Sequence, residues 1–119
     1  MAIIGFVKVQ SSTIENKYLR VKSINIGACL YEVYDKKKKI NLILNLGPTK
    51  NYSSKNFYVG ATCGRYAGRI SNSKFNIKNK IYKLDGNEGK NTLHGGKIGF
   101  DRLEWKIHQH SKNKIIYKL

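Results

Sequence analysis

Short runs in which apolar and polar residues alternate constrain the fold of this chain more than any other feature. Leu19 and Val21 are separated by Arg20 within a run that extends over residues 18–26, and a similar alternation covers residues 40–46. Successive side chains of an extended strand point to opposite faces, so these runs give a strand one apolar and one polar face. No window of useful length shows the 3.6-residue period of an amphipathic helix. The sequence therefore predicts an all-β protein.

Residues with turn chemistry separate these runs. Lys78 and Asn79 suit the turn of a hairpin, and the charged run 35–39 is read as a solvated turn, with a phosphate-binding patch as the alternative. Residues 47–69 and 85–101 are rich in glycine and lack alternation, and long irregular segments of a compact domain often carry function. We expect strands over residues 3–9, 18–26, 29–34, 40–46, 75–77, 81–84, 104–108 and 114–119.

The formal net charge of +16 raises the question of nucleic-acid binding. Only four of the 23 basic residues are Arg, the side chain best suited to read guanine and to fork onto phosphate. The basic residues are also spread evenly along the chain. Nucleic-acid binding is therefore the weaker alternative. No run approaches the roughly 18 apolar residues of a membrane span, and the N-terminus lacks a signal-peptide pattern, so we expect no membrane partner and a cytoplasmic location.

Metal ligation is not indicated by the cysteines and histidines. Cys29 and Cys63 lie far apart, and neither has a Cys or His at metal-ligand spacing. We interpret them as small buried apolar residues, with a disulfide as the open alternative. His108 and His110 fall on one face of an expected strand, but no third ligand accompanies them, and we read them as solvated. We therefore expect no metal site.

Two residues of the glycine-rich segments are the candidates for a binding site. His94 precedes Gly95 and Gly96, which allow close backbone approach, and its imidazole can donate to a ligand oxygen or give up a proton. The alternative is a histidine that only caps backbone groups in a turn. Arg69 lies with Arg65 in a segment of small residues, and guanidinium donors suit an oxygen-rich ligand. The alternative here is a pair of surface arginines.

Aromatic residues near these segments are interpreted as packing residues. Phe100 and Trp105 could stack against a sugar ring, but core packing is the better interpretation. Tyr58 and Val59 are read as core for the same reason. The sequence contains no phosphate-binding loop, dinucleotide fingerprint, serine-hydrolase elbow or zinc-protease helix.

Taken together, the glycine-rich segments and the hairpin between them resemble the aldose 1-epimerase (galactose mutarotase) family over about residues 17–107. The motifs are Gly60-Ala-Thr-Cys-Gly-Arg-Tyr-Ala-Gly-Arg-Ile70, the pattern F-x-[IL]-x-[NG]-x-x-Y-x-L over residues 75–84, N-x-L-H-G-G at residues 91–96, and Gly99-Phe100-Asp101 with Trp105. A single H-G-G would be weak, but this ordered combination is specific.

The resemblance implies a large antiparallel β-sandwich, of which residues 1–119 would form a single partial domain, the N-terminal part. It implies an isomerase of hexose metabolism that interconverts the α and β anomers of sugars such as galactose and glucose without a metal or organic cofactor. A carboxylate base takes the proton of the anomeric hydroxyl, and a histidine acid protonates the ring oxygen. Arg69 resembles the family's sugar-binding arginine. His94 resembles its first active-site histidine, which binds the sugar and assists at the ring oxygen.

Two departures from the family pattern shape the functional expectation. Gly68 stands where the family usually has Asn. The family's principal acid histidine and its glutamate base lie further downstream than the matched motifs. We therefore expect little or no mutarotase activity from these 119 residues alone, and we expect a complementing C-terminal polypeptide or self-association. The alternatives are a non-catalytic carbohydrate-binding module and the remnant of a disrupted gene.

Overall fold

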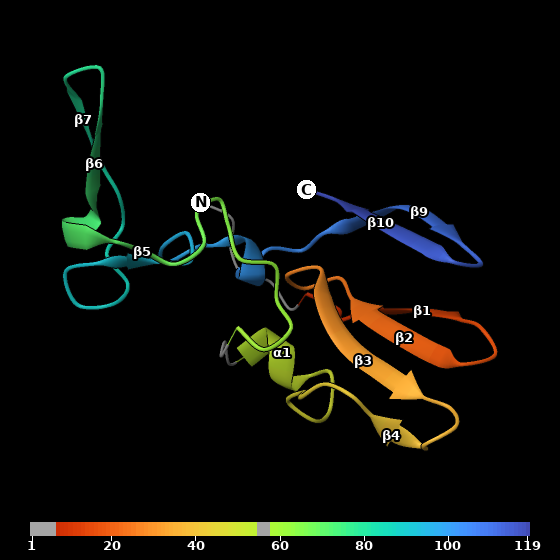
Figure 1. Cartoon of the computed structure of the whole chain (residues 1–119). Coiled ribbons are helices and arrows are strands. Elements are labelled where there is room, and N and C mark those ends of the chain that lie inside the picture. The colour runs from red at the N-terminus through yellow and green to blue at the C-terminus, as the bar shows by residue number, and fades with distance from the viewer. Residues whose placement is uncertain (1–6, 55–57) are drawn as a thin grey trace.

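The computed structural model describes residues 7–54 and 58–119, and nearly all of its regular structure is antiparallel β (Figure 1). A four-stranded sheet in the order β1-β2-β3-β4 forms one end of the molecule, and three two-stranded ladders, β5-β8, β6-β7 and β9-β10, form the rest. The sheet consists of β1 (Ser11–Glu15), β2 (Leu19–Ile24), β3 (Cys29–Asp35) and β4 (Ile40–Asn41). The remaining elements are α1 (Asn51–Ser54), β5 (Arg69–Ile70), η1 (Ser71–Ser73), β6 (Lys74–Ile77), β7 (Lys80–Lys83), β8 (Thr92–Leu93), η2 (Phe100–Arg102), β9 (Lys106–Ser111) and β10 (Lys114–Lys118). The all-β prediction is confirmed.

The pairing of β2 with β3 follows the alternation seen in the sequence. Val21 lies opposite Val33, and on the other face of β2 the Arg20 side chain crosses to β3. Its Nε donates to Glu32 Oε1 at 2.8 Å, and its guanidinium lies 4.5 Å from the centre of the Tyr34 ring. Cross-strand pairs of this kind stabilise antiparallel sheets. The expected strands over 18–26 and 29–34 are confirmed with small changes at their ends.

The strand expected over residues 40–46 is mostly wrong, because only Ile40 and Asn41 join the sheet. The Asn41 side chain intervenes: its Oδ1 accepts a hydrogen bond from the backbone N–H of Val33 at 3.0 Å. Asn45 Oδ1 likewise accepts from the backbone N–H of Gly47. Asn side chains that bind nearby backbone groups compete with a strand ladder, and here they end the strand.

The N-terminal strand expected over residues 3–9 is not found where it can be assessed. Its first four residues lie outside the described residues, and residues 7–9 are not in a strand. The side chain of Asn25 holds this segment instead of a ladder, since its Oδ1 accepts from the backbone N–H of Gln10 and its Nδ2 donates to the Lys8 carbonyl. β1 was not among the expected strands, because the polar composition of this edge strand gives little alternation.

The hairpin predicted around Lys78 and Asn79 is confirmed. Both residues have positive φ, at 46° and 63°, as a two-residue hairpin turn requires. Phe75 lies opposite Tyr82 in the ladder, and their rings stack at 5.3 Å. Figure 1 shows this β6–β7 hairpin projecting as an arm from the end of the molecule opposite the four-stranded sheet.

The centre of the molecule is the turn between β2 and β3, which joins segments far apart in sequence. Ile24, Ile26 and Cys29 are its buried apolar residues. Gly27 donates its backbone N–H to the Leu103 carbonyl, and its own carbonyl accepts from Thr62. Glycine is required at position 27, because φ is +66° and a Cβ would lie 2.6 Å from the Asp101 carbonyl oxygen.

The C-terminal hairpin of β9 and β10 lies beside the β1–β2 edge of the sheet (Figure 1). Ser23 Oγ and Tyr117 Oη lie 2.9 Å apart, and His110 Nε2 lies 2.9 Å from the Thr13 carbonyl oxygen. The side chains of His108 and His110 are exposed, as expected. Within residues 7–54 and 58–119, no group of three His, Cys, Asp or Glu side chains is placed to hold a metal ion, and no helix is long and apolar enough to cross a membrane.

Candidate functional site

The short ladder of β5 and β8 brings the two candidate residues together. Arg69 lies opposite Leu93, and His94 follows β8 directly. The backbone N–H of His94 donates to the Gly68 carbonyl at 3.0 Å, and the backbone N–H of Gly68 donates to His94 Nδ1 at 3.1 Å. A neutral imidazole whose Nδ1 accepts carries its proton on Nε2. The loop therefore sets the ring so that Nε2–H is the donor available to a ligand.

The glycines after His94 have a different role from the one expected. A Cβ at Gly95 would lie 1.9 Å from the Gly64 carbonyl oxygen, and a Cβ at Gly96 would lie 3.1 Å from the Asp85 carbonyl oxygen. Both residues also have positive φ. They let the chain pass close to neighbouring backbone rather than close to the imidazole. The two glycines still matter for the site, because this close approach fixes the backbone path of the loop that begins at His94.

Tyr58 belongs to this site and not to the core, which corrects the interpretation from sequence. Its ring lies 4.7 Å from the His94 ring, tilted by 57°. Asn87 secures the same region: its Oδ1 accepts from the Leu93 N–H at 2.7 Å, and its Nδ2 donates to the Leu93 carbonyl and to the Tyr58 hydroxyl. The Asn87 side chain thus takes the place of a backbone partner for β8 and also positions the tyrosine.

Glu88, which was not expected as a site residue, binds the guanidinium of Arg69. Nε and Nη2 of Arg69 donate to the two carboxylate oxygens of Glu88, with the Nη2–Oε1 distance at 2.6 Å. This hydrogen bonding lowers the pKa of Glu88 and raises the pKa of Arg69. The Arg69 side chain is still 60% exposed, so it remains accessible to a ligand. No local signal could have revealed this pair, because the two residues are 19 positions apart.

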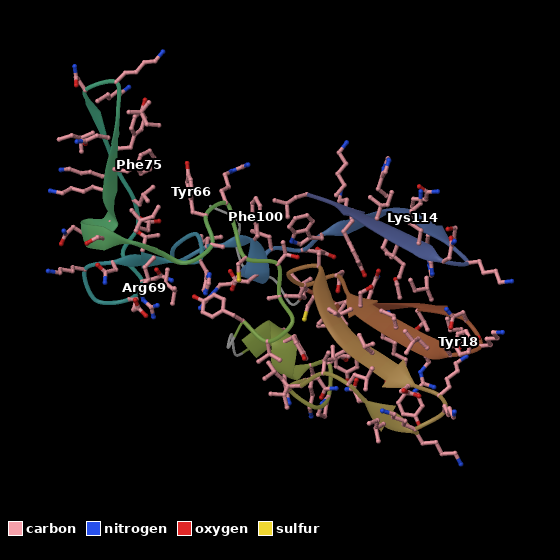
Figure 2. All side chains as sticks on the ribbon, in the orientation of Figure 1. Tyr18, Tyr66, Arg69, Phe75, Phe100 and Lys114 are labelled. Atoms are coloured by element: carbon pink, nitrogen blue, oxygen red, sulfur yellow. The ribbon has the colours of Figure 1, made fainter. Side chains whose placement is uncertain are left out.

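Arg65 does not join Arg69, although both come from the same glycine-rich segment. Its guanidinium lies 5.3 Å from the centre of the Phe100 ring. Figure 2 shows Arg69 near the base of the β6–β7 hairpin and Phe100 nearer the centre of the molecule. Phe100 in turn meets Trp105 edge to face at 5.4 Å, and the indole N–H donates to the Phe100 carbonyl at 3.0 Å. This mutual contact supports packing roles for both aromatic residues.

Two cysteines and Asp101 are the remaining groups of interest near the centre of the molecule. Both cysteines are free, which excludes the disulfide alternative in this structure. Cys29 is buried, and this burial raises the pKa of its thiol to about 11, while Cys63 is half-buried. Asp101 is buried, and neither of its carboxylate oxygens has a hydrogen-bond partner among the described residues. Burial raises the pKa of Asp101.

The fold and this loop site define a class of protein, an antiparallel β protein with a polar Arg–His loop site. A family model described as aldose 1-epimerase matches residues 10–119. The aldose 1-epimerase of Haemophilus influenzae is 35% identical over 115 residues, which cover 92% of this chain and 33% of that protein. The galactose mutarotase of Sus scrofa is 37% identical over 104 residues, which cover 85% and 30% respectively.

Solved structures agree with these sequence matches. A GalM/aldose epimerase homologue from C. elegans superposes with a TM-score of 0.85 at 28% identity, over 94% of this chain and 36% of that one. Galactose 1-epimerase from Lactobacillus acidophilus gives a TM-score of 0.74 at 31% identity, over 85% and 34%. The chain belongs to the aldose 1-epimerase family, and it spans about a third of the length of the curated relatives it matches.

Proposed function

We propose that residues 1–119 form a single partial domain, the N-terminal part of an aldose 1-epimerase, and contribute the sugar-binding half of its site. The proposed ligand is a hexose such as galactose or glucose. The observation that carries the proposal is the reciprocal hydrogen bonding of Gly68 and His94 beside the exposed guanidinium of Arg69. The names of the relatives, aldose 1-epimerase and galactose mutarotase, support the choice of ligand.

Arg69 and His94 would act through directed donors. A sugar presents hydroxyl and ring oxygens, each of which accepts hydrogen bonds, and guanidinium N–H groups supply several donors in a rigid plane. Because Glu88 holds two of the Arg69 donor atoms, the guanidinium is oriented before a ligand arrives. His94 Nε2–H would donate to the ring oxygen or a neighbouring hydroxyl, with the Tyr58 ring packed against the imidazole.

The reaction proposed for the whole site is the interconversion of anomers by ring opening. A base removes the proton of the anomeric hydroxyl, an acid protonates the ring oxygen, and the bond between C1 and that oxygen breaks. The aldehyde rotates, and closure on its other face reverses the two proton transfers. These proton transfers and bond changes balance without an oxidant or a metal ion. We assign His94 the assisting role at the ring oxygen, and the principal acid and base implied by the resemblance are not among these 119 residues.

Nuclear magnetic resonance with freshly dissolved α-D-galactose or α-D-glucose tests both parts of the proposal. We expect saturable shifts of the amide signals of Gly68, Arg69 and His94, and we expect the anomers to interconvert at the uncatalysed rate. Loss of those shifts in Arg69→Ala and His94→Ala supports the sites. Clear acceleration of mutarotation by this chain that His94→Ala abolishes contradicts the expectation of inactivity. The absence of any shift at millimolar sugar contradicts the sugar site itself.

A non-catalytic carbohydrate-binding module is the second candidate, favoured by the exposure of Arg69 and by the departure at Gly68. It predicts the same shifts, but no anomer exchange even when the remainder of the family fold is supplied.

We also propose a cytoplasmic location, supported by the two free cysteines, since reducing compartments keep thiols unpaired.

A further inference from the structure

The carboxylate of Glu88 comes from a loop whose backbone is fixed at several points. The backbone N–H of Glu88 donates to the Asn91 carbonyl at 3.2 Å, and the N–H of Asn91 donates to the Glu88 carbonyl at 2.9 Å. Asn91 Oδ1 accepts from the N–H of Asn72 at 3.2 Å, and the hydroxyl of Ser73 donates to the Lys90 carbonyl at 2.9 Å. These bonds tie the turn before β8 to η1, which follows β5. The position of Glu88 is therefore set by the β5–β8 region itself.

The contact between Arg69 and Glu88 leaves hydrogen-bonding capacity on both side chains. A guanidinium carries five N–H groups, and two of them, on Nε and Nη2, donate to the Glu88 carboxylate, so three remain. Each carboxylate oxygen has two lone pairs and accepts one of these bonds, so each can accept another. The side chains are 60% and 35% exposed, and Figure 2 shows Arg69 beside the β5–β8 ladder. The pair therefore presents donors next to acceptors to a ligand.

A hydroxyl group suits this pair, whereas an anionic oxygen does not. A hydroxyl both donates and accepts, so a sugar can accept from Arg69 and donate to Glu88. An ionised carboxylate or phosphoryl oxygen only accepts, and the Glu88 carboxylate repels its charge. Binding sites discriminate between ligands by such repulsive elements as well as by attractive ones.

The charges around the loop would favour anions if Glu88 were absent. The chain has 23 Lys and Arg residues against seven Asp and Glu. The hydrogen bond from Arg69 is the main cause of the lowered pKa of Glu88, and the charges of Arg69 and His94 lower this pKa further. Glu88 is therefore ionised at neutral pH. Without it, the loop would present a guanidinium and an imidazole in a strongly basic chain, which is the chemistry of an anion-binding site.

We propose that Glu88 is a specificity-determining residue of the Arg69 site: it directs the guanidinium to sugar hydroxyl groups and excludes ligands that place a carboxylate or a phosphate against Arg69. This role rests on the sugar site proposed above. The excluded ligands are uronates and sugar phosphates that would bind through their charged group. Glu88 selects the ligand by its charge and by the orientation it gives to Arg69, without contact with the reacting atoms.

Titration with inorganic phosphate tests the exclusion without any sugar. The magnetic resonance signal of the Arg69 Nε–H group reports binding at low salt. We expect Glu88→Gln, which removes the charge at nearly constant size, to bind phosphate at Arg69 at least about fivefold more tightly than the original chain, the factor for one unit charge at about 4 Å in water. Glu88→Asp keeps the charge and should still exclude phosphate. No gain in Glu88→Gln, or the same gain in Glu88→Asp, overturns the proposal.

Glu32→Gln is a matched control in the four-stranded sheet. Nε and Nη2 of Arg20 donate to the two carboxylate oxygens of Glu32 at 2.8 and 3.4 Å, so the same two donor atoms are used as in Arg69. The variant breaks an equivalent pair and changes the net charge by the same amount as Glu88→Gln. We expect its Arg69 signal to respond to phosphate as in the original chain. An equal gain at Arg69 in Glu32→Gln would show that net charge alone excludes anions, and this would overturn the proposal.

Galactose titrations separate this role from the proposed function. We expect Glu88→Gln to bind galactose about tenfold more weakly, the effect of losing one charge-assisted hydrogen bond, so its preference shifts towards the anion. Galactose binding by the original chain, with no phosphate gain in Glu88→Gln, refutes the role of Glu88 and supports the sugar site. A phosphate gain in Glu88→Gln, with no galactose binding by any of these chains, refutes the sugar site and supports the exclusion of anions by Glu88.

Discussion

Gly68 and His94 form two hydrogen bonds with each other across the start of the β5–β8 ladder. The carbonyl of Gly68 accepts from the His94 backbone at 3.0 Å, and the N–H of Gly68 donates to the imidazole Nδ1 at 3.1 Å. A single glycine therefore holds both the backbone and the ring of the candidate histidine.

Substitution of His94 by Asn separates ring positioning from ligand donation. The Asn Oδ1 can accept from Gly68 N–H as Nδ1 does, but no donor then occupies the place of Nε2. We expect His94→Asn to keep the Gly68 amide signal near its wild-type shift while weakening hexose binding about tenfold, the effect of losing one donor to a ligand oxygen. His94→Ala should lose both. Titration with galactose, followed by amide shifts, measures this, and wild-type affinity in His94→Asn would contradict the proposed donor role.

Alanine at Gly68 and at Gly95 should have very different effects on stability, although both glycines have positive φ. Nothing lies within 4 Å of a Cβ at Gly68, whereas a Cβ at Gly95 would meet the Gly64 carbonyl oxygen at 1.9 Å. We expect Gly68→Ala to lower the free energy of unfolding by about 1–2 kcal/mol, the cost of a left-handed alanine. Gly95→Ala adds a backbone clash, and its cost should be clearly larger. Urea unfolding measures both, and equal costs would contradict the packing around Gly95.

The open space at Gly68 also bears on the departure from the family pattern. Asn tolerates the left-handed region better than other residues that carry a Cβ, so Gly68→Asn should cost less stability than Gly68→Val. If the family's amide contacts the sugar, Gly68→Asn will tighten hexose binding, and Gly68→Val will not. Urea unfolding and a galactose titration of the two variants check this, and the reverse order of stability would contradict it.

Protonation of Glu88 should determine how the Arg69 site responds to acid. The hydrogen bond from Arg69 lowers the pKa of Glu88, so the stabilising ion pair is present above the ordinary carboxyl pKa and is lost as the pH falls through the lowered value. We expect the Arg69 Nε–H signal to move in acid with the protonation of Glu88. Glu88→Gln should remove that transition, with little change in stability because the pair is exposed. A transition of the same midpoint in Glu88→Gln would show that another group causes it.

Asp101 gives the opposite pH dependence. Burial raises its pKa, and its two oxygens have no hydrogen-bond partner among residues 7–54 and 58–119. The unfolded chain therefore loses the Asp101 proton at lower pH than the folded chain, and the contribution of Asp101 to stability falls as the pH rises above about 3.9. We expect Asp101→Asn to gain about 1 kcal/mol at neutral pH relative to the original chain, the scale of one buried polar group that lacks a hydrogen bond.

The difference between the two chains isolates Asp101, because all other titrating groups are shared. Unfolding in urea at a series of pH values should show the advantage of Asp101→Asn growing from acid to neutral pH. An advantage that does not change with pH would show that the pKa of Asp101 is the same in the folded and the unfolded chain. A loss of stability would show that the contact of the Asp101 carboxylate with Arg102 Nε, at 3.7 Å, stabilises the fold.

Several features of the fold could be predicted because their causes are local. The β6–β7 hairpin combines alternating residues with Lys78 and Asn79, and Asn readily adopts the positive φ that the turn needs. The strand expected over 40–46 failed because the pattern shows alternation but not the competing bonds of the Asn41 side chain, which depend on where Val33 lies. Arg69 and His94 were found as candidates by residue type and by neighbouring glycines.

The sequence by itself determined the all-β class, the β6–β7 hairpin and the two candidate residues, since these depend on side-chain period, turn chemistry and motifs within a few positions. Only the tertiary structure decided that Glu88 binds Arg69, that Tyr58 packs on His94, and that Asp101 is buried without a hydrogen-bond partner among the described residues. Each of these contacts depends on strand pairing and on glycines that let segments distant in sequence pack closely. Contacts of that kind are set by how the strands pair in space, and no local pattern of residues encodes them.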